Sequence, residues 1–270
     1  MKVIDILGNI MGCCTSSVHP QVPLPELPPG IVQLTKDTPQ NILDSAIDIM
    51  TRSFAGTKTT SPEPALSWAF DTTCSGENPC GPLLEAPSEE RIAAFRWLVL
   101  FSLETSLRHG GCFALMDGED ETKVHTCSLN FPPNNRNLHN PGFCDVITTL
   151  HKVGLNNSFN SKRMSAVEKA MTKGHKTYAK DPHWYCQIFA TSPESQRKGY
   201  GKRMLQFLSQ LSDKSGVPFY LETTGEKNEQ FYGKCGFEVV ERYPLIVGSD
   251  KLDVNGGMAA MVRPPKEILQ

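Results

Sequence analysis

The sequence predicts an α/β or α+β fold, in which helices cover a sheet that contains some parallel strand pairs. In the second half of the chain, short apolar segments alternate with helical patterns, and residues 183–191, HWYCQIFAT, are almost continuously apolar. Such a strand is typical of the middle of a sheet covered on both faces, and strands that alternate with helices favour parallel pairing. With 270 residues and 39% hydrophobic residues, the chain can form a packed domain.

The first half of the chain predicts strands and helices without such alternation. The predicted elements are a strand at 30–37, a helix at 38–56, a long loop at 57–87, a helix at 88–110 and a hairpin at 111–131. Thr38 suits the N-cap of the first helix and Gly56 its end, since a short polar side chain and a glycine are favoured there. Asp117-Gly118 is typical of a hairpin turn.

The second half predicts regular elements after a stretch, 131–182, that is difficult to interpret. The predicted elements are helices at 143–155 and 165–180, a strand at 183–191, a helix from Gly199, a strand at 217–223, a short helix at 226–236, and strands at 237–245 and 256–263. In the helix after Gly199, residues Met204, Leu205, Leu208 and Leu211 share one face, which is typical of an amphipathic helix that packs on a core.

Composition and charge argue against several classes of function. The formal net charge is −2, so the overall electrostatics do not favour nucleic acid as a partner. The longest unbroken apolar run, Trp97–Phe101, is much shorter than the ~20 residues of a membrane-spanning helix. The nine cysteines are irregularly spaced; Cys74 and Cys80 could form a disulfide or share a metal, but no second ligand pair follows at zinc-finger spacing. Reduced thiols in a cytoplasmic protein without a metal are therefore favoured.

The first 30 residues predict a flexible tail that precedes a single domain at 31–265. Read from Met11, the sequence fits N-myristoylation of Gly12 and palmitoylation of Cys13 and Cys14, and two such anchors together hold a protein at a membrane. That interpretation requires translation to start at Met11; a tail without lipids is the alternative. Residues 20–30 are rich in proline and predict a linker into the domain.

The segment QRKGYGKRML, residues 196–205, places two glycines and four cations where a loop becomes a helix. A helix start presents N–H groups without intrahelical partners and the positive end of the helix dipole, so it binds anions. Glycine removes the side chains that would keep a phosphate away from the backbone and permits positive φ. The segment therefore predicts a pyrophosphate site; a solvent-exposed basic turn is the alternative.

Two common nucleotide motifs do not fit this segment. A Walker loop needs Ser or Thr after Gly201-Lys202, where this chain has Arg203. A dinucleotide fingerprint needs a third glycine, where this chain has Met204.

The spacing of Gln196, Gly199 and Gly201 resembles the acetyl-CoA motif of the GNAT superfamily of N-acetyltransferases. Downstream, residues 221–240, LETTGEKNEQFYGKCGFEVV, are similar to the second motif of that family: a strand, an Asn and an FY-x-x-x-GF sequence. The resemblance covers about residues 183–243.

This resemblance implies a GNAT-like mixed sheet, mostly antiparallel and flanked by helices, with a parallel splay between the fourth and fifth strands. It implies acetyl-CoA as co-substrate, held by main-chain amides at the end of the central strand and in the glycine loop. Carried over to this sequence, the cofactor-binding positions are Phe189, Ala190, Thr191, Gln196, Arg197, Lys198, Gly199, Tyr200, Gly201, Lys202 and Asn228. The residues at 183–185, HWY, resemble the branch that contains puromycin N-acetyltransferase.

The resemblance also implies a general acid. Tyr232 stands where the family often has a tyrosine that protonates the departing CoA thiolate. Asn228 lies four residues earlier, so the helical spacing predicts that it shares the ligand-facing side of the short helix with Tyr232. Phe231 and Cys235 would then face the core, although Tyr232 as an ordinary core residue is the alternative.

The general base is less well defined. An aliphatic amine of pKa ~10.4 is almost fully protonated at neutral pH, so a base must assist its attack. Glu222, at the end of the strand at 217–223, is the first candidate, and His183 and Glu194 are weaker ones. An acyl-cysteine on Cys186 or Cys235 is disfavoured, because no His–Asp pair is placed to activate either thiol.

These observations predict an enzyme that transfers an acetyl group from acetyl-CoA to a primary amine by direct attack in a ternary complex. The acceptor would be a small molecule or peptide amine, and residues 131–182 with the first two helices would form its pocket. Two alternatives remain: a GNAT-fold sensor that binds an acyl-CoA without turnover, and a lipid-anchored interaction protein. RNA binding through residues 197–203 is disfavoured, because the segment lacks interleaved aromatic residues.

Overall fold

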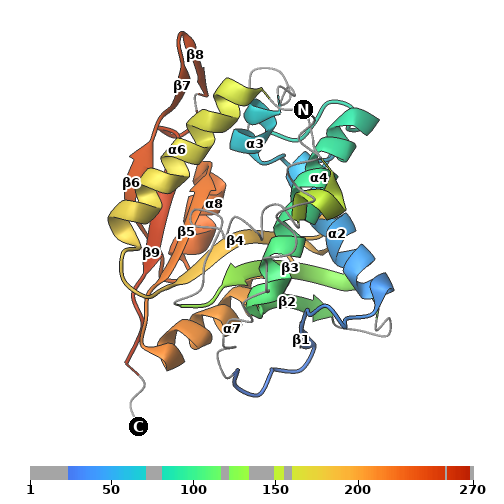
Figure 1. The fold of residues 1–270 in the computed structure, drawn as a ribbon, viewed down its shortest axis with the longest axis vertical. Helices are drawn as coiled ribbons and strands as arrows, with labels where there is room; N and C mark the ends of the chain where they lie inside the picture. The colour runs from blue at the N-terminus through green and yellow to red at the C-terminus, as the bar shows by residue number, and fades with distance from the viewer. Residues whose placement is uncertain are drawn as a thin grey trace, which may run out of the picture.

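The computed structural model describes residues 24–70, 81–116, 122–133, 149–154, 160–252 and 254–267 (Figure 1). The acylation sequence after Met11, Cys74 and Cys80, the turn at Asp117-Gly118 and most of the helix expected at 143–155 lie outside these residues. None of the helices in the described ranges combines the length and apolarity needed to cross a bilayer.

A seven-stranded mixed sheet forms the centre of the molecule, in the spatial order β1-β2-β3-β4-β5-β9-β6 (Figure 1). All neighbouring strands are antiparallel except β4 and β5. The strands are β1 (Ile31–Gln33), β2 (Gly111–Met116), β3 (Val124–Phe131), β4 (Trp184–Thr191), β5 (Phe219–Thr224), β6 (Glu238–Tyr243) and β9 (Met258–Arg263). The prediction of a mostly antiparallel sheet with a parallel pair between the fourth and fifth strands is confirmed.

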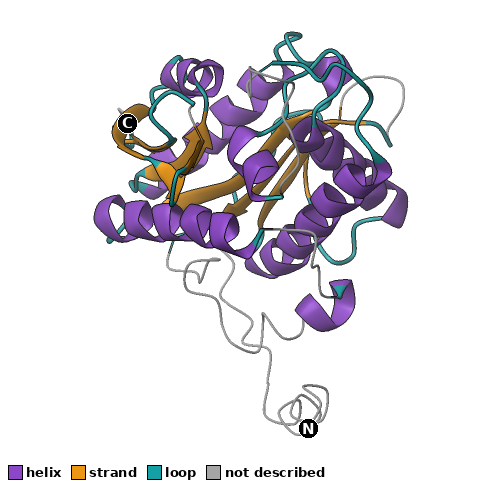
Figure 2. Cartoon of the chain, turned by 90° about the horizontal axis from the view of Figure 1, so that it is seen from above, coloured by secondary structure: helices purple, strands orange, loops and turns teal. Residues whose placement is uncertain are grey.

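Helices cover both faces of this sheet (Figure 2). Alternate residues of β2 divide between two clusters: Phe113 and Leu115 pack against α7, whereas Cys112 and Ala114 pack against α2 and α4. One face carries α7 and α8, and the other carries α2, α4, α3 and α6. The helices are α2 (Gln40–Ala55), α3 (Pro64–Ala69), α4 (Glu89–Ser106), α6 (Ser161–Tyr178), α7 (Tyr200–Ser215) and α8 (Glu226–Gly233), with short 3₁₀ turns η2 (Leu107–His109) and η3 (Pro193–Ser195).

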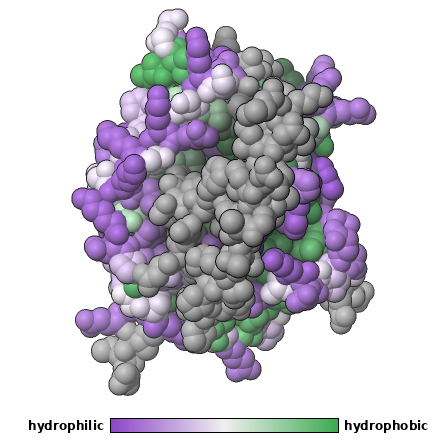
Figure 3. Space-filling model, viewed as in Figure 1, coloured by the Kyte–Doolittle hydropathy of each residue, from purple (hydrophilic) through white to green (hydrophobic). Residues whose placement is uncertain are grey.

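Helix α6 has one buried side and one charged side. Val167, Ala170 and Gly174 are buried against the sheet. Its lysines point to solvent, and the surface over this helix in Figure 3 is mainly hydrophilic. This helix therefore behaves as an amphipathic cover for the edge of the sheet formed by β5, β9 and β6.

The structure differs from the sequence prediction in three local elements. The loop expected at 57–87 contains α3, whose N-cap is Glu63: the Glu63 Oε2 atom accepts a hydrogen bond from Leu66 N at 2.6 Å. The strand expected at 237–245 is broken at Pro244, after which β7 (Leu245–Val247) pairs with the unforeseen β8 (Asp250–Leu252) as a separate hairpin. Thr38 does not cap α2; its hydroxyl accepts from Thr35 N at 2.8 Å instead.

Residues 24–30, within the expected tail, lie against the domain. Leu24 and Leu27 pack against the core cluster under α7, and the Arg203 side chain donates a hydrogen bond to the Pro29 carbonyl. This contact brings the start of the described chain next to the first turn of α7.

Candidate active site

The paired strands β4 and β5 separate part of the way along their length. Their parallel register joins Trp184 to Phe219, Tyr185 to Tyr220 and Cys186 to Leu221, and it ends there although both strands continue. In β4, Gln187 is an extra residue opposite β3, because Leu129 pairs with Ile188 and Asn130 with Cys186. A bulge increases local twist, so it is a physical cause for the divergence of the two strands. The separation leaves the β5-facing edge of β4 without strand partners from Gln187 to Thr191.

The glycine loop turns from β4 into α7 with two residues at positive φ. Arg197 has φ +63° and Gly199 has φ +89°, and α7 begins at Tyr200. The first backbone bond of the helix runs from Arg203 N to Gly199 O at 3.0 Å. The amide groups of residues 200–202 therefore precede the hydrogen-bond ladder of the helix and point out of its N-terminus.

The space in front of this helix start is open on one side. A Cβ atom added at Gly199 would meet nothing within 4 Å. At Gly201, it would lie 3.0 Å from Thr191 Oγ1 and 3.6 Å from Phe189 Cε1, so the missing side chain lets the helix approach the end of β4. Lys198 and Lys202 are exposed around the same opening. The structure thus brings the loop and the end of β4 together, as the sequence predicts, and the loop can hold an anion.

The remaining predicted cofactor residues support the shape of the loop. Thr191 O accepts hydrogen bonds from Gln196 Nε2 at 3.3 Å and from Ser53 Oγ at 2.8 Å. Tyr200 stacks on His125 with ring centroids 4.2 Å apart and an interplanar angle of 4°. Ala190 is buried against α2 and α4, so its side chain faces away from α7. Only the backbone of Ala190 is therefore available to a ligand on the α7 side.

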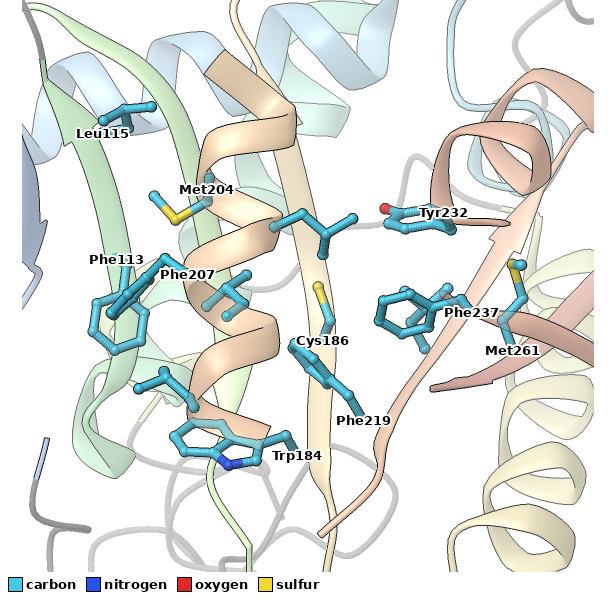
Figure 4. Close-up of a cluster of buried hydrophobic side chains, with 14 of the residues drawn as sticks. Phe113, Leu115, Trp184, Cys186, Met204, Phe207, Phe219, Tyr232, Phe237 and Met261 are labelled. Atoms are coloured by element: carbon cyan, nitrogen blue, oxygen red, sulfur yellow. The ribbon is translucent and has the colours of Figure 1, made fainter. Parts of the chain in front are cut away.

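Tyr232 lies in the core on the α7 side of the sheet. Its side chain packs beside Phe189 at 6.2 Å and Phe237 at 5.7 Å between ring centroids. Figure 4 shows its hydroxyl directed from α8 toward the space beside β4. Burial raises the pKa of Tyr232 well above its ordinary value, with smaller contributions from Cys186 and Cys235. The phenol therefore stays protonated at neutral pH.

The predicted division of α8 into ligand-facing and core-facing residues is wrong. Tyr232 is 9% exposed and belongs to the core cluster, whereas Phe231 and Cys235 are only partly buried at its edge. Asn228 is exposed, and its Nδ2 atom donates to Thr224 O at the end of β5 at 3.0 Å. The sequence did not show that Tyr232 packs in the core while Asn228, four residues earlier, is exposed.

Glu222 lies on the opposite face of the sheet, one residue beyond the last β4–β5 pair. Burial raises the pKa of Glu222 to about 8, and interactions with the hydroxyls of Tyr220 and Tyr185 limit that rise. A carboxylate with this pKa is a much better proton acceptor near neutral pH than an ordinary glutamate. The chemistry of a general base fits this position.

The weaker base candidates are engaged elsewhere. Glu194 is bonded to Arg52 at 2.5 Å; burial raises its pKa, but the Arg52 contact outweighs this and holds the pKa below its usual value. His183 bonds to His175 and to the Asp181 carbonyl. Burial raises the pKa of the Cys186 thiol to about 12 and also raises that of Cys235, which disfavours either sulfur as a nucleophile.

The sequence does not identify three side chains on the Glu222 face. Tyr185 and Tyr220 pair across β4 and β5, which places both near enough to Glu222 to lower its pKa. Glu63, at the start of α3, interacts with Thr224 and has a pKa raised by burial. A signal for Glu63 was present, since an acidic residue before proline is a recognisable helix start, but the surrounding composition suggested a loop.

Within the described ranges, no group of three His, Cys, Asp or Glu side chains is arranged to hold a metal ion.

Comparison with known proteins gives one family and several similar chains. Residues 166–239 match the family described as acetyltransferase (GNAT) domain. A stretch of 96 residues is 27% identical to an uncharacterised N-acetyltransferase of Schizosaccharomyces pombe and covers 35% of this chain. The chain matches only 37% of the length of that relative.

Solved structures share the fold at low sequence identity. Arylalkylamine N-acetyltransferase 2 from Aedes aegypti is 13% identical with a TM-score of 0.55, over 87% of this chain and 98% of that one. A structure described as histone acetyltransferase HPA2 and related acetyltransferase from Corynebacterium glutamicum is 18% identical with a TM-score of 0.52, over 90% of this chain and 100% of that one.

Proposed function

We propose, from the match of residues 166–239 to the acetyltransferase (GNAT) domain family, that this chain transfers an acetyl group from acetyl-CoA to a primary amine of a small molecule or peptide. The amine attacks directly, in a complex that holds both substrates. One observation carries this proposal: β4 and β5 diverge beside an unobstructed glycine helix start, with a proton donor on one face of the sheet and a proton acceptor on the other.

The residues present fit acetyl-CoA, which when bound supplies an acetyl thioester for the amine to attack. The amides of residues 199–202 would hold its pyrophosphate, because they precede the helix ladder and no side chain at Gly199 blocks them. The unpaired edge of β4 from Gln187 to Thr191 offers main-chain donors and acceptors for its extended arm. Lys198 and Lys202 add positive charge around the same opening.

Tyr232 and Glu222 would carry the proton transfers. Tyr232 stays protonated at neutral pH, so its hydroxyl has a proton for the departing sulfur, although the raised pKa makes it a weaker acid and does not promote the transfer. Glu222 accepts a proton from the amine on the other face of the sheet.

The acceptor would approach from the face that carries α3 and α6. This face holds the Glu222 carboxyl and, at the end of β5, Glu63 next to Thr224. The exposed lysines of α6 lie on the outer side of that helix. The buried side of α6 separates them from Glu222. A small amine is favoured over a nucleic-acid-bound substrate, since the net charge of the chain is −2.

Titration with acetyl-CoA followed by measurement of free thiol with a panel of amines tests the proposal. Binding of acetyl-CoA and amine-dependent thiol release are the expected results. Binding without release for any amine would instead support an acyl-CoA sensor, and absence of binding would contradict the site. Desulfo-CoA with the same amines separates acceptor binding from turnover.

A further inference from the structure

His125, the second residue of β3, is an extra residue in the pairing of that strand with β2. Leu115 is opposite Thr126 and Met116 is opposite Val124, so His125 has no partner in β2. This end of β3 runs beside the end of β4, because Thr126 pairs with Thr191. The bulge therefore lies next to the glycine loop, and a bulge changes the direction in which a side chain points.

His125 and Thr126 both reach the α7 side of the sheet, although they are neighbours in one strand. The Thr126 hydroxyl is 3.1 Å from that of Thr191, which lies beside Gly201 in the first turn of α7. The His125 ring stacks on Tyr200, the first residue of α7. Neighbouring side chains of a regular strand point to opposite faces, so the bulge is what lets His125 reach the loop.

His125 holds the glycine loop at three points. Its carbonyl oxygen accepts a hydrogen bond from Ser192 N at 2.9 Å, and its Nδ1 atom is hydrogen-bonded to Ser195 Oγ at 2.7 Å. Its ring lies parallel to that of Tyr200, with 4.2 Å between the centroids. His125 is 7% exposed and Ser195 is 2% exposed, so the hydrogen bond between their side chains is sheltered from water.

The strained part of the loop lies between these contacts. Arg197 has φ +63° and Gly199 has φ +89°, and both residues stand between Ser195 and Tyr200. A residue other than glycine keeps a left-handed conformation only where its surroundings hold it. The backbone bond from Lys198 N to Ser195 O inside this segment is long, at 3.4 Å. Contacts with His125 before and after Arg197 therefore help to maintain the shape of the loop.

We propose that His125 is a positioning residue for acetyl-CoA: by holding Ser195 and Tyr200, it keeps the amides of residues 199–202 arranged to receive the pyrophosphate. A loop that already has its bound shape loses less conformational freedom when the ligand binds. Because His125 acts through the loop, its loss should lower affinity and leave the chemical step unchanged. This inference rests on the proposed acetyl-CoA site, but not on the identity of the acceptor.

Substitutions of His125 separate the hydrogen bond from the stacked ring. His125→Phe keeps a ring beside Tyr200 without an atom that can bond to Ser195, whereas His125→Asn keeps a polar atom near the Nδ1 position without the ring. Each should weaken acetyl-CoA about fivefold in calorimetric titration, and His125→Ala should weaken it more than about tenfold. Ser195→Ala removes the same hydrogen bond from the loop side and should match His125→Phe, which keeps the test open if His125→Ala does not fold.

S-acetylpantetheine, a donor without the pyrophosphate, gives a readout that a general loss of stability would not. With acetyl-CoA, His125→Ala should lower kcat/KM through KM alone; with S-acetylpantetheine, its kcat/KM should equal that of the wild type. His109→Ala is the matched control, because His109 is also buried, at 3% exposed, and packs on an aromatic ring, Phe131, at 5.0 Å. Its affinity for acetyl-CoA should equal that of the wild type, whatever its Tm.

The failure of this inference and the failure of the proposed function are distinguishable. If the wild type binds no acetyl-CoA, both are overturned. If it binds acetyl-CoA but transfers the acetyl group to no amine, only the proposed reaction fails, and the titrations still decide the role of His125. If the His125 variants bind acetyl-CoA as tightly as the wild type, or lose kcat/KM equally with both donors, only the role of His125 is overturned.

Discussion

The two faces of the sheet at the point where β4 and β5 diverge differ in their chemistry. On the α7 side, the buried groups are aliphatic and aromatic side chains and a thiol, and the titratable ones among them, Tyr232 and Cys186, are held in their protonated forms. On the α6 side, the Glu222 carboxyl sits among tyrosine hydroxyls with a pKa of about 8. Burial is the largest effect that keeps the titratable groups of the α7 face protonated, whereas on the other face interactions with tyrosine hydroxyls offset part of the effect of burial and keep the Glu222 carboxyl closer to ionisation.

Replacement of the proton acceptor, Glu222, should have the largest effect on the rate of acetyl transfer. Glu222→Gln should lower kcat by about 10²–10⁴, since it removes the base but keeps the shape of the side chain. The wild-type rate should rise with pH until about 8, because Glu222 must be ionised to accept a proton. Steady-state kinetics across pH 6–10 measure the loss of kcat and the pH dependence. A Glu222→Gln variant with full activity would show that the α6 face does not supply the base.

The donor side is tested by Tyr232→Phe. This change should slow acetyl transfer by up to about 10² while the affinity for acetyl-CoA stays nearly the same, because only the proton donor is lost. Single-turnover rates and a binding titration separate the two. An equal loss of rate and affinity would mean that Tyr232 contributes only to packing, as its place in the core cluster allows.

A charge at the helix start should weaken the ligand site of the α7 face alone. Gly199→Glu should reduce acetyl-CoA affinity at least tenfold, because a carboxylate would repel the pyrophosphate at the amides of α7. Gly216→Glu is the matched control: Gly216, at the other end of α7, has φ +65° and also has open space at Cβ. Both variants should lose about 1 kcal/mol through backbone strain, but only the first should lose affinity in calorimetric titration.

The smallest expected effect is on stability. The pKa of Glu222 is about 8 in the folded chain and near 4.5 when solvated, so the folded state binds this proton more tightly. The free energy of unfolding of the wild type should therefore fall as pH rises from about 4.5 to about 8. Glu222→Gln lacks this loss, so its Tm should exceed that of the wild type at pH 9 by several degrees, at about 2–4 °C per kcal/mol. A Tm difference that does not change with pH would contradict the burial of this carboxyl.

The sequence predicted those parts of the fold that local patterns determine. The glycine loop, α7 and the apolar strand β4 follow from spacing and composition, and they appear where they were expected. The parallel β4–β5 pair came from the resemblance to a known family. Glu63 and α3 were missed, because a six-residue helix inside a Pro-rich and Ser-rich stretch has too few turns to show a period.

Other features of the site could not be read from the sequence because they arise across strands. Tyr185 and Tyr220 are 35 positions apart and meet only through the parallel register. The packing of α6 over Tyr220 depends on Gly174, where an added Cβ would lie 2.6 Å from the Tyr220 hydroxyl, and this role is visible only once α6 lies on the sheet. The orientation of Tyr232 into the core likewise depends on how α8 packs, which a four-residue spacing cannot specify.

Gln187 changes which way the rest of β4 faces. Trp184 and Cys186 point to the α7 side, but Ile188 and Ala190 point to the α2 and α4 side, although all four numbers are even. Its side chain is held to α4 by Ser102 and Ser106, each at 3.1 Å. If this single residue were deleted, every side chain from 188 to 191 would exchange sides, and Phe189 and Thr191 would leave the glycine loop. Which face of the sheet each side chain of β4 points to, rather than the identity of any one side chain, thus decides whether the end of β4 can contact a ligand at the glycine loop.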